Sequence, residues 1–335
     1  MFDRHPGFAH ERHPPRASTL PLQIDLLGIP SDAGASRRGC SMGPEALRVA
    51  GLRETLVSLG HDVADLGDLR KESGLNQLSV AARQAEVLAL AAQSSEKGLA
   101  SLQRGRLPIF LGGDHSLSMG TISGVARHCA AAKRALHVLW IDAHGDFNTP
   151  ATSPSGNLHG MPLALLCNEP EFGEAFRGDW RGSVDPQNVT ILGARSIDRA
   201  ERQLLETRGV DVVDMRRIDE LGAAALMREI IEKVQATDAH LHVSLDVDAI
   251  DPAIAPGAGT PVAGGLTYRE AHIAMEMLHD AQCLGSLDIV ELNLFLDHAG
   301  RSAEILVDLT ASLFGRQIMP RQPTRRLIVA TPVAH

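Results

Sequence analysis

Three side chains that can bind metal ions lie at alternate positions where an apolar run ends, in "IDAHGDFNTP": Asp142, His144 and Asp146. Successive side chains of an extended chain point to opposite faces, so Asp142 and His144 point the same way. Carboxylate oxygens and imidazole nitrogens are common ligands of divalent cations. The spacing therefore predicts a two-pronged metal ligand at the end of a strand.

Two other apolar runs end in residues of the same kinds. His115 follows "LPIFL" in "GGDHS", and Asp246 and Asp248 follow "LHVSL" in "DVDAIDP". Because ligands gather at the carboxyl ends of parallel strands, we expect these side chains to meet those of the first stretch. Four carboxylates and two neutral imidazoles balance the charge of two divalent cations. This oxygen-rich, sulfur-free set favours Mn²⁺ over Mg²⁺, Fe²⁺ or Co²⁺ and disfavours Zn²⁺.

Each motif alone has a simpler interpretation. Asp114 or Ser116 can cap the helix expected from "SLSMG", and a single Asp-x-His pair arises by chance in loops. His137 and His242 lie inside apolar runs, and we expect both in the core. A binuclear metallophosphoesterase also begins with Asp-x-His, but it needs later GNHD or GNHE and GHxH motifs, which "GNLH" does not match. Only the three motifs together indicate a binuclear metal site.

Short apolar or β-branched runs alternate with longer stretches of helical spacing, such as residues 76–105 and 267–282. This alternation predicts an α/β fold with a parallel sheet covered by helices on both faces. The predicted strands are "LQIDLLGIP", "HDVADLG", "LPIFLGGD", "LHVLWIDAH", "NVTILGAR", "VDVVDM", "LHVSLDVDAID" and "LGSLDIVELN".

No shift in composition and no repeat of fixed period divides residues 22–316, which predicts one domain. Residues 1–21 mix charged residues and prolines and are expected to form a flexible arm. Residues 317–335 are expected to form a C-terminal tail, either disordered or extended against a neighbour.

Composition argues against several classes of partner. No apolar run reaches the roughly 18 residues needed to span a bilayer, so we expect no membrane partner. A net charge of −9 and an aromatic content of 3% argue against nucleic acid binding. The four cysteines lie far apart and include no Cys-x-x-Cys pair, which predicts neither a zinc ribbon nor a disulfide framework and fits a cytoplasmic location.

Five ordered motifs resemble those of the ureohydrolase family, and within it the arginases: "GGDHS", "DAHGDFNTP", "SGNLHGMP", "SLDVDAIDPAIAPGAGTPVAGGLTYRE" and "LDIVELN". The opening "GIPSDAGASRRGCSMGPEALR" is similar to the first motif of the family, and the resemblance covers residues 22–316. It implies a single three-layer α/β catalytic domain, with a central, mainly parallel sheet of about eight strands flanked by helices.

The resemblance also implies a cofactor and a reaction. Two Mn²⁺ ions per subunit would be bound, one by His115, Asp142, Asp146 and Asp246 and the other by Asp142, His144, Asp246 and Asp248. A metal-bridging hydroxide would attack the guanidinium carbon of L-arginine and so produce L-ornithine and urea. By motif position, Asp146 would pass a proton to the departing amine, Glu291 in "VELN" would orient the guanidinium, and His159 in "NLHG" would act as proton shuttle or general acid.

The far end of the substrate would be recognised by Asn148 and Ser155, as donors to its carboxylate, and by Asp198, as acceptor of its ammonium. Asn148 and Ser155 can instead organise turns in a proline-rich loop. Two residues depart from the usual arginase pattern: Ser196 stands where a second acid is common, and Leu294 stands where a proline is common. We expect these departures to affect substrate affinity and the loop after Glu291, rather than the type of reaction.

Two other functions fit the same motifs. A sister ureohydrolase such as agmatinase or guanidinobutyrase would keep every metal ligand and differ only in how it recognises the far end of the substrate. A pseudoenzyme would bind without turnover, although no metal position of the pattern is lost here. The resemblance further implies a homo-oligomer, trimer or hexamer, with L-arginine as its small-molecule partner.

Overall fold

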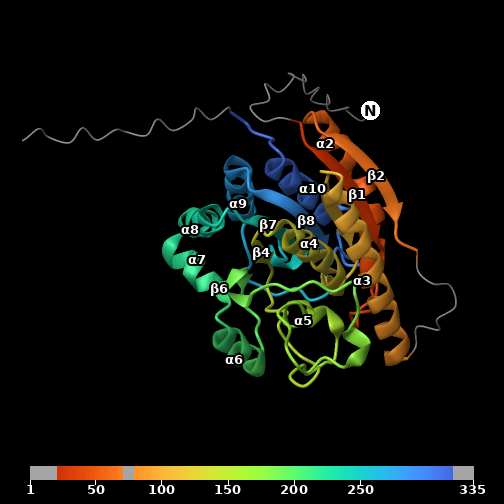
Figure 1. Cartoon of the computed structure of the whole chain (residues 1–335). Helices are drawn as coiled ribbons and strands as arrows, with labels where there is room; N and C mark the ends of the chain where they lie inside the picture. Colours follow the sequence, from red (N-terminus) through yellow and green to blue (C-terminus); the bar gives the residue numbers. More distant parts are fainter. Residues whose placement is uncertain (1–20, 71–78, 320–335) are drawn as a thin grey trace, which may run out of the picture.

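All eight predicted strands form, and they pair in parallel into one sheet in the computed structural model, which describes residues 21–70 and 79–319 (Figure 1). The order across the sheet is β2-β1-β3-β8-β7-β4-β5-β6. The strands are β1 (Gln23–Ile29), β2 (Asp62–Asp68), β3 (Leu107–Gly112), β4 (Leu136–Ile141), β5 (Val189–Ala194), β6 (Asp211–Asp214), β7 (His240–Asp246) and β8 (Leu284–Val290).

Helices cover both faces of the sheet, so the predicted three-layer α/β fold is confirmed (Figure 1). One hydrophobic core joins the sheet to α1 (Gly43–Val49), α2 (Leu52–Ser58), α7 (Met215–Leu221), α8 (Ala223–Ala236), α9 (Tyr268–Ala281) and α10 (Arg301–Leu313). A second core joins it to α3 (Val80–Gln103), α4 (Ser118–Ala132), α5 (Pro162–Leu166) and α6 (Arg199–Arg208). Strand β4 serves both cores, because Leu139 and Ile141 point into the first and Val138 and Trp140 into the second.

Helices α3 and α4 pack closely because two glycines of α4 face the backbone of α3. A Cβ atom added at Gly120 would lie 2.3 Å from the carbonyl oxygen of Ala91, and one added at Gly124 would lie 2.3 Å from that of Ser95. Real Cβ atoms do not approach other atoms so closely. The absence of a side chain at these two positions therefore sets the distance between the helices.

The predicted site residues lie at the ends of five strands that are neighbours in the sheet, β3, β8, β7, β4 and β5, or in the segments that follow them. The carboxyl ends of parallel strands lie at one edge, so the five following loops converge there. The expected cap at the β3 end forms on a short 3₁₀ helix and not on α4, which begins at Ser118 without a side-chain cap. Asp114 accepts a hydrogen bond from the backbone N–H of Ser116 at the start of the short 3₁₀ helix η2 (His115–Leu117).

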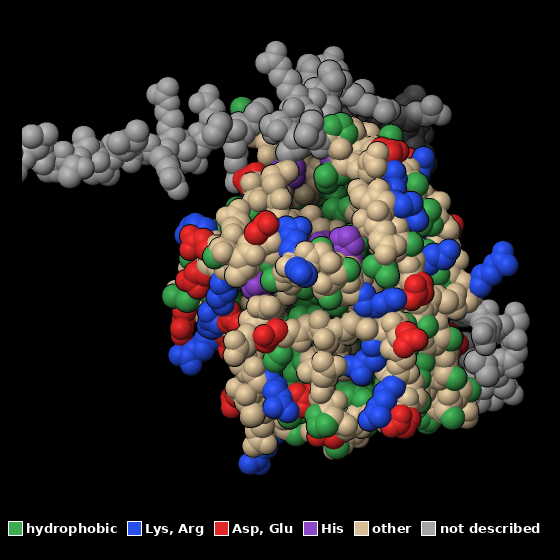
Figure 2. Space-filling view, in the orientation of Figure 1, with side chains coloured by type: hydrophobic (Ala, Val, Ile, Leu, Met, Phe, Trp, Pro, Cys, Tyr) green, Lys and Arg blue, Asp and Glu red, His purple; other side chains and the backbone are tan. Residues whose placement is uncertain are grey.

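The predicted arm (residues 1–21) and tail (residues 317–335) lie outside the described residues, apart from residue 21 and residues 317–319, and the domain limits stay a prediction. Among the helices of the described ranges, none is long and apolar enough to cross a membrane. His137 and His242 are buried, as expected. On the face shown in Figure 2, basic and acidic side chains are interspersed rather than gathered by sign.

Candidate metal centre

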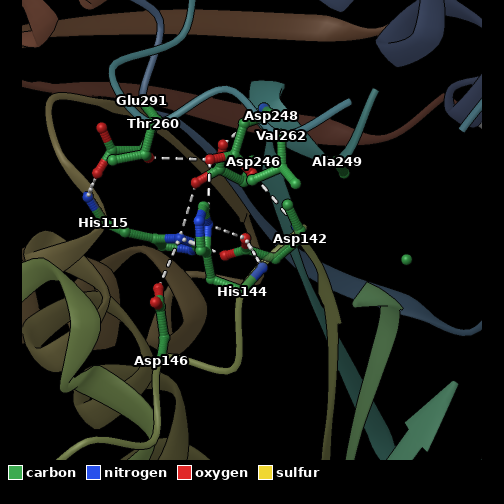
Figure 3. A network of polar contacts seen from close by, with 12 residues as sticks. His115, Asp142, His144, Asp146, Asp246, Asp248, Ala249, Thr260, Val262 and Glu291 are labelled. Carbon is green, nitrogen blue, oxygen red and sulfur yellow. Dashed lines mark hydrogen bonds and ion pairs between the residues drawn. The ribbon is translucent and has the colours of Figure 1, made fainter. Parts of the chain in front are cut away.

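Side chains from three strand ends meet in one buried cluster (Figure 3). The stretch after β4 supplies Asp142 and His144, β7 ends at Asp246, and Asp248 lies in the 3₁₀ helix η6 (Val247–Ala249) that continues it. His115, in η2 after β3, completes the cluster. Each acid-rich stretch turns back on itself, because Asp142 accepts from the N–H of His144 at 2.7 Å and Asp246 accepts from that of Asp248 at 2.7 Å.

The ring of His115 is aimed at three carboxylates. Its Nδ1 lies 3.0 Å from Asp142, 3.2 Å from Asp146 and 3.1 Å from Asp246, measured to Oδ2 in each case. This nitrogen is buried and has no hydrogen-bond partner within the described part of the chain. The ring cannot easily turn away, because Nε2 lies 2.8 Å from the hydroxyl of Ser244 and the ring stacks on Trp140 at 3.8 Å. An unpartnered nitrogen that faces three carboxylate oxygens is the arrangement expected of a metal ligand.

A second group of potential ligands shares one residue with the first. Nδ1 of His144 lies 3.3 Å from Asp142 Oδ1 and 3.2 Å from Asp248 Oδ2. Two sets of donors could each hold an ion, His115–Asp142–Asp246 and Asp142–His144–Asp248, and Asp142 belongs to both. Asp146 joins the first set through its contact with His115. The donors fit two hard divalent cations bridged by a carboxylate; a bridging role for Asp246 stays a prediction.

The charges of the cluster favour added positive charge. Burial lowers the pKa of His144, but the carboxylates of Asp142 and Asp248 raise it to about 12. Burial also opposes the charged form of His115, yet its three carboxylate neighbours raise its pKa well above the ordinary value. Burial and the charge of Asp142 raise the pKa of Asp146 to about 6. Bound cations would supply this positive charge and leave both imidazoles free to act as neutral ligands.

Two acidic residues of the site have backbone conformations that residues other than glycine rarely adopt. Asp146 has φ of 47° and Glu291 has φ of 63°, both in the left-handed region. Such conformations cost energy and persist where the surroundings enforce them. Here they direct both carboxylates into the cluster and the cavity beside it.

A cavity of about 130 Å³ opens onto the cluster, and all five predicted residues outside the metal set line it: Asn148, Ser155, His159, Asp198 and Glu291. The two residues that depart from the expected pattern differ in their location. Ser196 lines the cavity, whereas Leu294 packs against the first hydrophobic core.

Glu291 and His159 form a pair on the cavity wall. Oε1 of Glu291 accepts from the backbone N–H of His115 at 2.8 Å and lies 2.9 Å from His159 Nδ1. Burial raises the pKa of Glu291, but the charge and hydrogen bond of His159, together with the N–H and charge of His115, lower it overall. Burial lowers the pKa of His159, but the charge and hydrogen bond of Glu291 raise it to about 9. The pair is therefore ionised at neutral pH.

At the far end of the cavity, the two predicted carboxylate donors are already engaged in loop contacts. Asn148 donates from Nδ2 to Asp198 at 3.1 Å and accepts from the hydroxyl of Thr152 at 3.0 Å. The hydroxyl of Ser155 accepts from the backbone N–H of Asn157 at 3.2 Å. Both residues thus organise their loop and also line the cavity.

Glu201 and Thr260 are among the cavity residues that were not predicted from the sequence. Glu201 accepts from the N–H groups of Phe147 and Asp198, at 2.8 and 3.1 Å, and burial raises its pKa to about 7. The capping-box spacing from Asp198 to Glu201 was a usable signal. Thr260 donates to Asp248 Oδ2 at 3.1 Å, and no local pattern indicates that its loop folds back to this point.

Comparison with known proteins points to one family. The profile of the Arginase family matches residues 22–315. The arginase of Brucella suis is 47% identical over 310 residues, which cover 90% of this chain and 98% of that protein. The arginase of Agrobacterium fabrum is 46% identical over 304 residues, covering 89% and 93%. The crystal structure of the arginase from Bacillus cereus superposes with a TM-score of 0.82 at 41% identity, and covers 89% of this chain and all of that one.

Proposed function

This chain belongs to the arginase family, and on that premise we propose that it hydrolyses L-arginine to L-ornithine and urea with two Mn²⁺ ions per subunit. The observation that carries the proposal is the buried cluster in which His115 Nδ1 faces three carboxylates without a hydrogen-bond partner and Asp142 is shared by two ligand groups. The arginase relatives cover nearly the whole chain, which supports the same reaction.

Six residues would hold the ions. The first ion would be bound by His115, Asp142, Asp146 and Asp246, and the second by Asp142, His144, Asp246 and Asp248. When bound, the ions lower the pKa of water from about 15.7 towards roughly 7–9, and so supply a nucleophile near neutral pH. The stack of Trp140 on His115 and its donation from Nε1 to Asp142 at 2.9 Å would hold the ligands in orientation.

Glu291 is the group that would orient the guanidinium of the substrate. Its lowered pKa keeps it anionic, and a planar guanidinium binds a carboxylate through parallel hydrogen bonds. Because Oε1 is already held by His115 and His159, the carboxylate is fixed before the substrate arrives. Preorganised charge of this kind stabilises the transition state more than water does.

Two groups can handle the protons of the reaction. Asp146 is one of the six proposed ligands, and its carboxylate can take up a proton and pass it to the departing amine. His159 lines the cavity in its protonated form and can donate a proton or exchange it with solvent. At the far end, Asp198 would accept from the ammonium of arginine, and Asn148 and Ser155 would donate to its carboxylate.

Urea release with arginine, agmatine and 4-guanidinobutyrate, measured with added Mn²⁺, tests this proposal directly. We expect arginine to be preferred over agmatine by on the order of 10² in kcat/KM. Agmatine has no carboxylate, so the donors that would bind the carboxylate of arginine are left unpaired when agmatine is bound. Agmatine equal to or better than arginine would instead assign the chain to a sister activity.

The metal requirement is tested in the same assay by Asp246→Ala. This change removes a ligand and should abolish nearly all activity and reduce the Mn²⁺ content of the purified protein. Asp219→Ala, at an exposed position of α7, is the control and should behave as the wild type. Full turnover and full metal content in Asp246→Ala would overturn the binuclear assignment.

A further inference from the structure

Arg195, just after β5, makes an unusual set of contacts. Its half-buried guanidinium donates five hydrogen bonds, and every acceptor is a backbone carbonyl oxygen. Nη2 donates to Asp248 at 2.6 Å and to Val262 at 2.7 Å, Nε donates to Val262 at 3.1 Å, and Nη1 donates to Gly193 at 3.1 Å and to Ala249 at 3.3 Å. The side chain therefore links the end of β5 to η6 and to the loop that follows it.

All of these carbonyl groups except that of Gly193, in β5, belong to the segments that place Asp248. Asp248 and Ala249 are part of η6, and Val262 lies two residues after Thr260, whose hydroxyl donates to Asp248 Oδ2. Figure 3 shows Val262 and Ala249 beside Asp248. Arg195 thus holds the backbone of Asp248 directly, and it holds the loop whose Thr260 fixes the side chain of Asp248.

An arginine is needed for this contact because its planar fork presents five donors in fixed directions, whereas the ammonium of lysine is a compact point charge with three donors. The loop is also fitted to the guanidinium. A Cβ atom added at Gly265 would lie 2.6 Å from Nη2 of Arg195, so the loop packs directly against it. A shorter or differently shaped head group would leave several carbonyl oxygens without a donor.

We propose that Arg195 is a positioning residue for the second ligand group, Asp142–His144–Asp248, and that it acts on metal affinity through the η6 loop. This inference rests on the proposed function, since it concerns the ions required there. Partners that orient metal ligands typically contribute 10- to 100-fold to metal affinity. The first ligand group has its own supports, Ser244 and Trp140, which Arg195 does not contact in the described structure.

The test is calorimetric titration of the metal-free, full-length protein with Mn²⁺, comparing wild type with Arg195→Lys. We expect two ions to bind to the wild type, and in the variant one of the two affinities should fall by roughly 10- to 100-fold while the other is unchanged. Arg181→Lys is the matched control, because Arg181 is also half-buried and donates to the backbone carbonyl of Leu165, away from the cluster. The control should keep both affinities.

Ligand-deleted backgrounds identify the weakened ion. In His144→Asn, Arg195→Lys should leave the affinity of the remaining ion unchanged, whereas in His115→Asn it should lower the affinity of the remaining ion by the same 10- to 100-fold. Thr260→Val, which removes only the hydroxyl donor to Asp248, should lower the affinity for the same ion. This variant replaces Arg195→Lys in the test if Arg195→Lys does not fold.

The outcomes separate the two proposals. If Arg195→Lys lowers the affinity for both ions equally, or for neither, the proposed role of Arg195 is wrong. If Arg195→Lys does not fold, wild-type Mn²⁺ affinities in a folded Thr260→Val variant overturn the proposal as well. Absence of Mn²⁺ binding by the wild type contradicts the proposed function itself.

Discussion

At the scale of single residues, the site depends on side chains whose free rotation is removed by neighbours. Asp142 accepts from Trp140 Nε1 on one oxygen and from the N–H of His144 on the other, and both ligand groups share it. His115 is fixed by stacking and by Ser244. If these side chains bind metal, they are arranged before an ion arrives, so little conformational entropy would be lost on binding.

His159 gives a prediction about catalysis. His159→Asn removes a group that can transfer protons, so kcat should fall by roughly 10² to 10⁴ while both Mn²⁺ ions remain bound. Turnover under saturating Mn²⁺ and metal content should be measured on the same preparation. If the metal content fell in parallel with kcat, His159 would be a ligand and not a proton donor.

The same variant has a predicted pH dependence of stability in the metal-free protein. The folded-state pKa of His159, about 9, lies above the ordinary value of 6.5, so the folded chain holds this proton more tightly than the unfolded chain. Its contribution is complete below about pH 6.5 and is lost as pH rises through about 9. The free energy of unfolding of the wild type should therefore exceed that of His159→Asn by on the order of 2 kcal/mol at pH 6. The difference between their denaturant midpoints should become smaller by pH 10. A constant difference would contradict the pairing with Glu291.

Asn148 gives a prediction about specificity. Asn148→Ala removes a donor from the far end of the cavity and also the hydrogen bond that steadies Asp198. The kcat/KM for arginine should fall by at least about 10-fold, while that for agmatine, which has no carboxylate, should change less. Equal losses for both substrates would mean that Asn148 only organises its loop.

At this scale the sequence predicted what lies within a motif and missed what depends on contacts between motifs. The six residues predicted to bind metal lie close to the five predicted to bind or act on the substrate, and the roles of all eleven stay predictions. Thr260 and Arg195 act through a loop that folds back from β7 towards β5, and nothing in their own stretches of sequence indicates that meeting.

At the scale of elements, the spacing of α3 and α4 is set by Gly120 and Gly124. Gly124→Ala would place a Cβ against the backbone of Ser95, and the steric cost should exceed the roughly 1 kcal/mol that alanine gains in helix propensity. We expect a net loss of about 1–3 kcal/mol in unfolding free energy, with unchanged Mn²⁺ stoichiometry. Gly173→Ala, at a position with no heavy atom within 4 Å, is the control. Stability equal to that of the control would show that the helices can separate freely.

The number and type of strands could be predicted from the sequence, but their order could not. Apolar runs and their alternation with helical stretches indicate eight parallel strands. That β8 lies between β3 and β7 depends on contacts between segments about 175 residues apart, such as Ile109 with Leu287. The local sequence pattern does not indicate which distant strands pair.

At the scale of the whole molecule, the bound ions should stabilise the fold. Four buried aspartates at one edge of the sheet repel one another, and cations that bind only the folded chain add stability by mass action. Mn²⁺ at about 100 times its dissociation constant should add roughly 2.7 kcal/mol per site. The melting temperature of chelator-treated protein should therefore rise by several degrees on adding Mn²⁺, and Asp246→Ala should show a smaller rise. Identical melting with and without Mn²⁺ would contradict a metal site in the folded chain.

The place of β8 in the sheet has a consequence for synthesis of the protein on the ribosome. Among the strands of residues 21–70 and 79–319, β8 is the last to be made, yet it fills the gap between β3 and β7 and is followed at once by Glu291. In a nascent chain that has not reached residue 284, the facing edges of β3 and β7 are unpaired. His115, which follows β3, then lacks the strand that aligns β3 with β7. Catalysis is thereby postponed until β8 has been made, and the two open edges make the unfinished chain a natural client for chaperones.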